Sequence, residues 1–190
     1  MGERAFDDPV RRQRITFRDQ SEEEIVTAEV RVEPGGDVPP HLHPRHDERF
    51  EVVEGDVRFT VGRRRMRASA GEHLVVPAGT RHAFKNTGST PATLRVEVEA
   101  GMELEPFLAD AAGLARAGAY TRLGLPTSFD ALLKLSVMVW HYRETTLLLN
   151  PPPALQPLLI RPLARLGERR GYRAGTFGDR PAPQVTARAE

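Results

Sequence analysis

The chain has 190 residues, enough for one globular domain with a smaller appended segment. Hydrophobic residues make up 39% of the sequence and charged residues 28%, a balance typical of a folded globular protein rather than a disordered one. The 27 Lys and Arg residues nearly cancel the 26 Asp and Glu residues, which argues against nucleic acid as a partner, and the absence of cysteine excludes disulfides, thiolate metal ligands and cysteine nucleophiles.

The first residues, MGERAFDDPVRRQRITF, contain no apolar stretch of the roughly 7–15 residues that a secretory signal needs. We therefore expect cytoplasmic residence. The most apolar later segment, residues 132–140, includes Lys134 and is much shorter than the roughly 20 residues needed to span a bilayer. No membrane association is expected.

Residues 15–99 alternate short apolar or β-branched runs with turn residues, a pattern typical of an all-β sandwich or barrel. The expected strands are ITF, IVTAEVRV, RFEVVEGDVRFTV, HLVVP, HAFKN and TLRVEVE. They leave no room for crossover helices, so the sheet should be mainly antiparallel. Leu94, Val96 and Val98 alternate with charged residues, which predicts a last strand that buries one face.

The pattern becomes helical after residue 100. Residues 102–119 carry apolar side chains at helical spacing and predict one helix. A second helix is predicted to run to Trp140, with Thr127 or Ser128 as its N-terminal cap. The three prolines after Asn150 must end any helix, because proline supplies no N–H donor.

Residues 154–170 resume a helical pattern that Pro157 and Pro162 interrupt, which predicts one kinked helix or two short ones. No periodicity follows, and the end of the chain is expected to be disordered. The predicted domains are a β-barrel over residues 1–100, a helical extension over residues 101–172 and a disordered tail over residues 173–190.

The second predicted helix offers more apolar surface than an isolated helix could leave in water. We therefore expect the extension to pack against the barrel, where it could close the mouth, or against a second subunit in a homodimer. The apolar residues are Leu132, Leu133, Leu135, Val137, Met138 and Trp140.

Three histidines and one glutamate form the most informative pattern. His41 and His43 are two residues apart, so on a strand both imidazoles lie on one face. Glu48 follows where the next expected strand begins, and His82 begins another strand after a turn. Such a set of N and O ligands suits Fe, Mn, Ni, Co, Cu or Zn. An H-x-H pair alone is common in proteins and would not predict a metal site.

These residues lie in two blocks that resemble the two conserved motifs of the cupin superfamily. The first motif is Gly, five residues, H-x-H, three or four residues, Glu, six residues and Gly; the second is Gly, five residues, P-x-G, two residues, His, three residues and Asn. Every specified position is present: Gly35, His41, His43, Glu48, Gly55, Gly71, Pro77, Gly79, His82 and Asn86.

The resemblance covers residues 34–99 and implies an antiparallel double-stranded β-helix, the cupin or jelly-roll barrel. It also implies one divalent metal ion held by the three histidines and Glu48, with Glu48 able to double as a catalytic base. A barrel that keeps these residues without loading metal stays the alternative. The resemblance says much less about the helical extension.

Strand parity with Glu48 and His82 places three further side chains inside the barrel, namely Phe50, Val52 and Phe84. They are candidates for an apolar substrate pocket, although any barrel needs such residues for its core. Asn86 is expected to be a structural hydrogen-bonding residue rather than a catalytic one.

Two more histidines and a basic run have weaker claims to a role in function. His46 and His73 could act as acid or base groups at the barrel mouth, but a solvated loop or strand face is the simpler interpretation. Residues 63–67 contain four arginines, and they are expected to form a solvated hairpin turn rather than a phosphate site.

The leading functional hypothesis is a metal-dependent enzyme that acts on a small organic molecule, namely an oxygenase resembling the quercetin dioxygenase-like cupins. A non-catalytic binding or sensor module is the alternative from another class, with the extension transmitting occupancy to a partner. A metal-assisted isomerase or lyase is the third hypothesis. Fold and metal ligands do not choose among them.

Overall fold

The computed structural model describes residues 3–18, 25–99 and 103–178. The strands are β1 (Glu3–Asp8), β2 (Gln13–Arg18), β3 (Ile25–Val32), β4 (Asp37–Leu42), β5 (Glu48–Glu54), β6 (Asp56–Val61), β7 (Arg64–Ser69), β8 (His73–Val76), β9 (His82–Lys85), β10 (Ala92–Glu99) and β11 (Leu147–Leu148). The helices are α1 (Leu104–Arg116), α2 (Phe129–His141) and α3 (Gln156–Arg169), with short 3-10 helices η1 (Tyr142–Glu144) and η2 (Pro153–Leu155).

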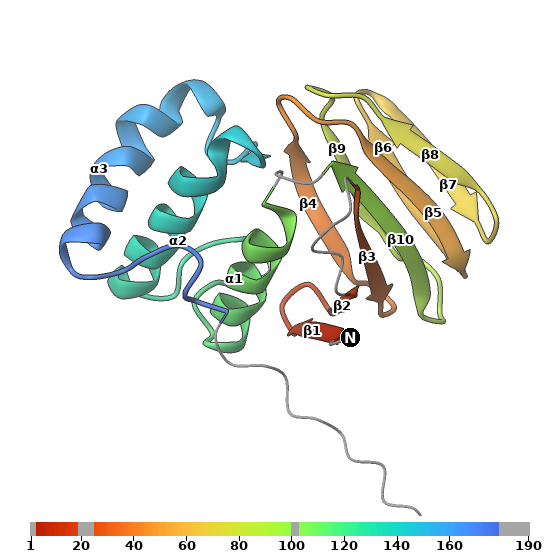
Figure 1. The fold of residues 1–190 in the computed structure, drawn as a ribbon, viewed down its shortest axis with the longest axis horizontal. Helices are drawn as coiled ribbons and strands as arrows, with labels where there is room; N and C mark the ends of the chain where they lie inside the picture. The colour runs from red at the N-terminus through yellow and green to blue at the C-terminus, as the bar shows by residue number, and fades with distance from the viewer. Residues whose placement is uncertain (1–2, 19–24, 100–102, 179–190) are drawn as a thin grey trace, which may run out of the picture.

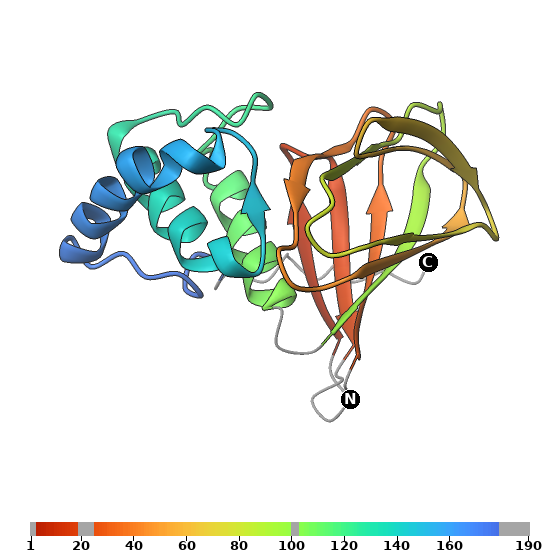
Figure 2. The same ribbon diagram turned by 90° about the horizontal axis from the view of Figure 1, so that it is seen from above.

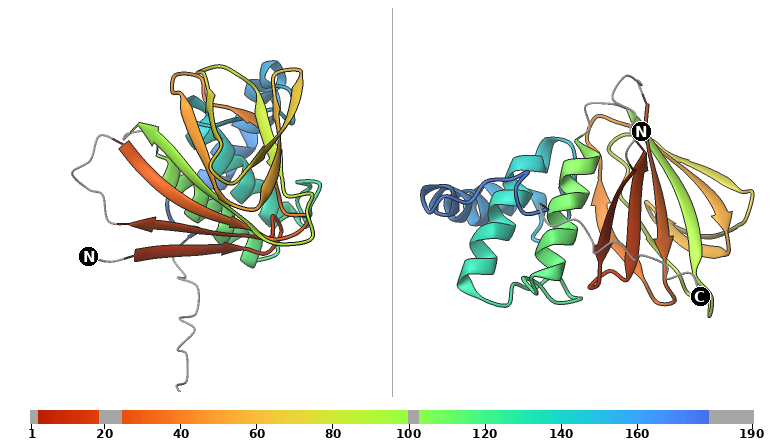
Figure 3. Two further views of the ribbon diagram at one scale, coloured as in Figure 1. Left: turned by 90° about the vertical axis from the view of Figure 1, so that its right-hand side faces the viewer. Right: turned by 60° about the horizontal axis from the view of Figure 1, so that its bottom comes forward.

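The strands form two antiparallel sheets that face each other. One sheet has the order β1-β2-β3-β10-β5-β8, and the other has the order β11-β4-β9-β6-β7. Figure 3 shows β1, β2, β3 and β10 side by side in the first sheet. The architecture is the antiparallel jelly-roll barrel with C-terminal helices that the sequence predicts.

Strand β10 illustrates how the sequence pattern produces the barrel. Leu94, Val96 and Val98 are all at most 5% exposed, whereas the alternating Arg95 and Glu97 are half-buried. The inward face of β10 joins aliphatic and aromatic side chains of both sheets in one apolar core. The predicted one-sided strand is therefore confirmed.

The helices lie together on one side of the barrel, next to β4 and the β1–β2 hairpin (Figures 1 and 2). Helix α2 begins after Ser128, whose Oγ accepts a hydrogen bond from the backbone N–H of Ala131 at 3.0 Å, as expected for a cap. Helix α3 is one continuous element with Pro162 inside it, and Pro157 lies in its first turn, where its missing N–H costs little. Among the described residues, no helix is long and apolar enough to cross a membrane.

The apolar face of α2 is used within the chain. Leu133, Val137 and Met138 are at most 4% exposed, and α2 packs against both α1 and α3. Buried side chains of α1, α2, η1 and the segment after α1 form a second core, separate from the barrel core. The surface from which a homodimer was expected is thus largely covered by the extension itself, and the homodimer stays a prediction.

Four strands, β1, β4, β7 and β11, lie outside those expected from the sequence. Strand β1 pairs with β2 in a hairpin at the N-terminus, and β11 pairs with β4 so that Leu148 lies opposite His41. Figure 2 shows the segment of the helical extension that contains β11 lying beside the barrel. The extension therefore completes the edge of a barrel sheet, and the boundary at residue 100 does not separate two independent structural units.

The basic run proves to be more than a turn. Only Gly62 and Arg63 form the turn, and the remaining arginines lie on strand β7, paired with β6. All four arginines are exposed, so their expected solvation is confirmed.

The first residues of the predicted disordered tail are ordered. The backbone N–H groups of Gly175 and Phe177 donate to the Asp110 carboxylate of α1 at 2.6 and 2.8 Å. This part of the prediction is wrong because a buried carboxylate fixes a segment that lacks periodicity of its own. Residues 179–190 of the predicted tail lie outside the described residues.

Candidate metal centre

The four predicted ligands come from both sheets and meet near one end of the barrel. His41 on β4 lies opposite His82 on β9 in the antiparallel register. His43 follows β4 by one residue, and Glu48 begins β5 in the other sheet. All four side chains are buried, and each offers a ligand atom within 4.8 Å of the others. The structure therefore brings together the quartet that the sequence singles out.

The turn before β9 places His82 beside His43. Gly79 has a φ of 72°, a left-handed conformation that glycine adopts without strain. Its backbone N–H donates to the carbonyl of His43 at 2.7 Å, which ties the turn to the end of β4. Asn86, fully buried, donates to the carbonyls of Val32 and Thr90 and has the structural role expected of it.

Each histidine of the quartet is held through its Nδ1 atom. The Nδ1 of His41 lies 2.9 Å from the carbonyl of Pro39, and that of His82 lies 2.9 Å from the carbonyl of Thr80. The Nδ1 of His43 lies 2.8 Å from the carbonyl of Thr145. Because a carbonyl oxygen can only accept, each Nδ1 carries the proton and each neutral ring has its lone pair on Nε2. These are the tautomers that bind a metal through Nε2.

The atoms at the centre of the quartet lack hydrogen-bond partners. Among the described residues, Nε2 of His43, Nε2 of His82 and Oε2 of Glu48 are buried without one. Glu48 Oε2 is 2.6 Å from His82 Nε2 and 3.3 Å from His43 Nε2. Buried polar atoms without partners are rare, and lone pairs facing one another need a cation between them. The donor set and its geometry therefore fit a divalent metal ion.

The pKa shifts of the quartet keep Glu48 ionised and His41 neutral. Burial would raise the pKa of Glu48, but the imidazoles of His43 and His82 hold it below its usual range. Burial would lower the pKa of His43, but the adjacent Glu48 carboxylate raises it. Burial and the neighbouring His82 lower the pKa of His41 to about 3, so its ring is neutral at physiological pH. The centre holds one ionised carboxylate and attracts a cation.

A cavity of about 380 Å³ leads from the quartet into the space between the barrel mouth and the helices. Its volume is within the range of sites for small organic ligands. Phe50 and Phe84, two of the predicted pocket residues, line it together with His41, His43 and Glu48. The other lining residues are mostly apolar and include Ile15, Val30, Val96, Leu104, Phe107, Leu108, Leu132, Leu135 and Met138.

Val52, the third predicted pocket residue, lies outside this lining. It is 1% exposed and belongs to the barrel core. Val52 faces the barrel interior, as strand alternation predicts. It lies four residues along β5 from Glu48, however, which is roughly 13 Å at about 3.3 Å per residue. Parity predicts the face of a strand and not the depth along it.

The two remaining barrel histidines stand apart from the quartet. His46 Nδ1 lies 3.1 Å from the Glu99 carboxylate near the surface, and His73 is exposed on β8. Neither belongs to the ligand cluster or lines the cavity.

The sequence does not predict the contributions of residues outside the barrel. Thr145, just after η1, supplies the carbonyl that orients His43, although the two residues are 102 positions apart. The Thr146 hydroxyl lies 3.4 Å from the same Nδ1. The cavity also receives Asp8, Arg11 and other residues of the N-terminal hairpin. No short-range sequence motif predicts these contacts, because they depend on packing between residues far apart in the sequence.

Comparison with known proteins gives matches over the barrel. Residues 28–99 match the family described as the cupin domain. Germin-like protein 5-1 from Oryza sativa subsp. japonica is 42% identical over 66 residues, which cover 32% of this chain and 30% of that protein. The rhicadhesin receptor from Pisum sativum is 42% identical over 75 residues, covering 37% of this chain and 35% of that protein. The matched segment spans about a third of these relatives.

Similar solved structures include a sugar phosphate isomerase of the cupin superfamily from Silicibacter pomeroyi, with a TM-score of 0.46 and 22% identity over 52% of this chain and 71% of that chain. A structure of oxalate oxidase has a TM-score of 0.42 and 28% identity over 48% of this chain and 52% of that chain.

Proposed function

Starting from a cupin domain over residues 28–99, we propose that this protein is a metal-dependent enzyme that acts on a small organic molecule. The proposed reaction is an oxidation of the dioxygenase type, in line with the predicted similarity to quercetin dioxygenase-like cupins. The proposed metal ligands are Nε2 of His41, His43 and His82 and a carboxylate oxygen of Glu48.

One observation carries the proposal. The three imidazoles donate their Nδ1 protons to carbonyl oxygens and direct their lone pairs toward a buried carboxylate. This arrangement has a cost in the absence of a cation, because it leaves buried polar atoms without partners. A divalent ion would bind all four ligand atoms and would supply Lewis acidity or, if redox-active, an electron-transfer centre.

The chain supplies a mostly apolar chamber next to that centre. Phe50 and Phe84, which belong to the barrel core, line the cavity together with residues of α1 and α2. A substrate that fills this space excludes water from the reacting atoms and strengthens electrostatic interactions there. Glu48, ionised and bound through one oxygen, could accept a substrate proton with the other.

A sensor function is the second candidate, and one contact favours it. The carbonyl of Thr145 holds His43, so the occupancy of the metal centre is linked directly to the segment between α2 and β11. A shift of His43 on ligand binding would first displace the segment between α2 and β11 and then the helices. In this case the cavity would bind a ligand without converting it.

The test is metal analysis of protein prepared without a histidine tag, followed by oxygen-uptake assays with phenolic, enediol and diketone substrates. The proposal predicts one Fe, Mn, Ni or Cu ion per chain and oxygen consumption that stops when the metal is chelated. Tightly bound Zn with oxygen-independent turnover would replace the oxygenase by an isomerase or lyase. Ligand binding without turnover under any metal would favour the sensor.

A further inference from the structure

One buried polar group on the cavity wall has no partner within the chain. Gln13, the first residue of β2, lines the cavity from the N-terminal hairpin. It is 8% exposed, and its Oε1 has no hydrogen-bond partner among the described residues. Of the side-chain atoms in the described part of the chain, only those of the quartet share this condition. Buried polar atoms without partners are rare, and a bound molecule can complete their hydrogen bonding.

Strand alternation directs the Gln13 side chain toward the barrel interior. Gln13, Ile15 and Phe17 are buried on one face of β2, whereas Arg14 between them is exposed. Ile15 and Phe17 belong to the barrel core, so an apolar residue at position 13 would continue the pattern. A buried amide costs free energy at such a position unless it forms a hydrogen bond. Packing alone therefore does not account for a glutamine here.

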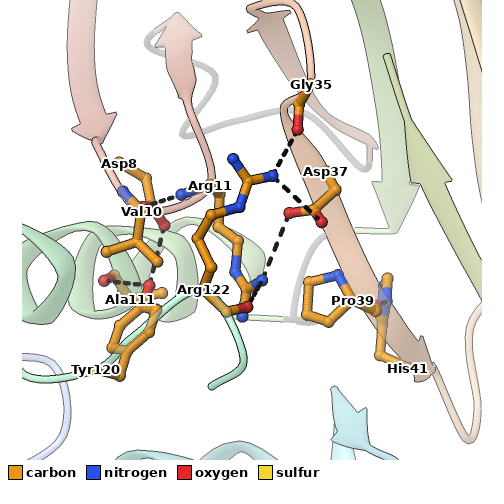
Figure 4. A network of polar contacts seen from close by, with 10 residues as sticks. All are labelled: Asp8, Val10, Arg11, Gly35, Asp37, Pro39, His41, Ala111, Tyr120 and Arg122. Atoms are coloured by element: carbon orange, nitrogen blue, oxygen red, sulfur yellow. Dashed lines mark hydrogen bonds and ion pairs between the residues drawn. The ribbon is translucent and has the colours of Figure 1, made fainter. Parts of the chain in front are cut away.

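The residues across from Gln13 cannot supply the missing donor. In the antiparallel register, Asp8 of β1 and Val32 of β3 lie directly opposite Gln13. The side chain of Val32 is apolar, and an ionised carboxylate only accepts hydrogen bonds. Asp8 already accepts from the backbone N–H groups of Val10 and Arg11 and from a tyrosine hydroxyl (Figure 4).

The charged groups at this end of the cavity are matched by one another. Arg11 Nη1 donates to the carbonyl of Arg122 at 3.0 Å and lies 3.4 Å from Asp37, and Arg122 Nη2 lies 3.7 Å from the other oxygen of Asp37 (Figure 4). Asp8 and Asp37 together balance the two guanidinium charges. A ligand group at this end is therefore expected to be neutral.

One continuous face of the first sheet leads from Gln13 to the quartet. Strands β2, β3, β10 and β5 are neighbours in that order, and each contributes residues to the cavity lining. Strands β2 and β5 are three strand spacings apart, roughly 14 Å at about 4.8 Å each. A ligand that reaches from Gln13 to Glu48 is therefore elongated. Between these two residues, the lining side chains of this face are apolar, namely Ile15, Ala28, Val30, Val96 and Phe50.

We propose that Gln13 is a specificity-determining residue of the cavity, and that the substrate is a neutral, elongated, mostly apolar molecule with a hydroxyl group at the end away from the quartet. The hydroxyl donates to Gln13 Oε1, and the other end of the molecule reaches the candidate metal ligands. This inference rests on the proposed function for the reacting end and on Gln13 for the recognised end. Gln13 lies outside residues 28–99, the segment that matches the cupin domain.

Other polar groups fit this position less well than a hydroxyl. A carboxylate or phosphate would direct its lone pairs against the amide oxygen, and an ether or ketone has no donor. An ammonium group donates, but burying its charge among apolar side chains costs much more than burying a hydroxyl. A hydroxyl supplies the donor without a charge.

The test compares 1-octanol with its isomer 1-methoxyheptane by titration calorimetry, on the metal-free and the metal-loaded full chain. The two probes are similar in shape, but only octanol has a hydrogen-bond donor. Octanol should bind about tenfold more tightly to both forms of the chain, because it gains one buried hydrogen bond. Gln13→Met should abolish this preference and leave the affinity for the ether unchanged. It should not lower the melting temperature, because Oε1 has no partner to lose.

Gln156→Met is the matched control, because it makes the same substitution at a buried glutamine outside the cavity lining. The Nε2 of Gln156 donates to the carbonyls of Leu148 and Pro151 at 2.6 and 2.9 Å. This variant loses hydrogen bonds within the chain, so its melting temperature should fall while the preference for octanol is kept. Gln13→Asn, which keeps the amide but shortens the side chain by one methylene, should reduce the preference at least threefold.

Equal affinities of the wild-type chain for the two probes, or no binding of octanol at millimolar concentration, would overturn the proposal. A preference that survives Gln13→Met would overturn it as well, and so would a melting temperature that falls as far in Gln13→Met as in Gln156→Met. A preference that disappears when the metal is removed would place the hydroxyl on the metal instead of on Gln13. A chain that binds no metal but keeps the Gln13-dependent preference would overturn the proposed function and leave the role of Gln13 standing.

Discussion

The two ends of the cavity are built in different ways. One end is formed by the four candidate metal ligands, barrel side chains that lie within 41 positions of one another in the sequence, from His41 to His82. The opposite wall is formed by the N-terminal hairpin and the helical extension, which are far apart in sequence. The candidate metal ligands thus come from the barrel, whereas segments outside residues 28–99 form much of the opposite wall.

The two regions are nevertheless linked. The carbonyl of Thr145 orients His43, and β11 pairs with the strand that carries His41. Asp110, in turn, fastens the segment around Gly175 to α1 and accepts a hydrogen bond from Tyr142, just before Thr145. If the comparison is right, changes in the extension should affect stability strongly and metal binding only moderately.

Removal of the extension should have the largest effect. A chain that ends at Glu99 would expose the apolar cavity wall and would lose both β11 and the Thr145 carbonyl. Each buried Leu or Val that packs across the interface contributes about 1.5–3 kcal/mol, so the truncated barrel should aggregate. Solubility and light scattering measure this. A soluble truncated barrel with the melting temperature of the full chain would show that the extension is an independent appendage.

Two histidine substitutions should distinguish a metal ligand from a nearby histidine that does not bind the metal. His82→Ala removes a ligand and should reduce metal affinity by about 100-fold or more, since outer-shell changes alone cost 10–100-fold. His46→Ala is the control, because His46 pairs with Glu99 and lies outside the cluster. Its metal affinity should be unchanged. Competition titrations with a chelator measure both, and an equal loss in both variants would refute the ligand assignment.

The stability of the extension should depend on one buried carboxylate. Asp110→Ala leaves the N–H groups of Gly175 and Phe177 without an acceptor and should lower the free energy of unfolding by about 2–4 kcal/mol. Asp130→Ala is the control, because that carboxylate is exposed and pairs with Lys134 at the surface. Its melting temperature should change much less. Similar melting temperatures for the two variants would show that Asp110 does not stabilise the extension.

The smallest effect is expected at the contact between extension and metal centre. Thr146→Val removes a hydroxyl 3.4 Å from His43 Nδ1 and should weaken metal binding by less than about tenfold, because the shorter bond to the Thr145 carbonyl remains. Thr145→Val keeps that carbonyl and should leave metal affinity unchanged. A larger loss of metal affinity in Thr145→Val than in Thr146→Val, measured by the same chelator titration, would contradict this prediction.

The convergence of the four candidate ligands follows in part from local features of the sequence. Alternation along a strand fixes the faces of His41 and His43, and the turn at Gly79 fixes where His82 emerges. The barrel and its one-sided strand β10 follow from the same alternation. The assignment of all four residues to one site nevertheless depended on the resemblance to cupin motifs, because spacing alone allows many arrangements.

The cavity wall could not be predicted in the same way. Arg11 looks like one of several arginines in a basic N-terminal segment, and its burial becomes evident only when Asp37 and Arg122 are placed beside it. Strand β11 has two residues, too few for a periodic pattern. The ordered residues after Arg173 depend on Asp110, a carboxylate that the sequence presents as one polar position on an Ala-rich helix.

The central claim is that three imidazoles and one carboxylate hold one metal ion. Anomalous diffraction from crystals of the metal-loaded protein tests it most directly. The account predicts one strong peak per chain inside the barrel, about 2.0–2.3 Å from Nε2 of His41, His43 and His82 and from a carboxylate oxygen of Glu48. A peak at another site, or a structure in which one of these four side chains points away from the ion, would contradict it.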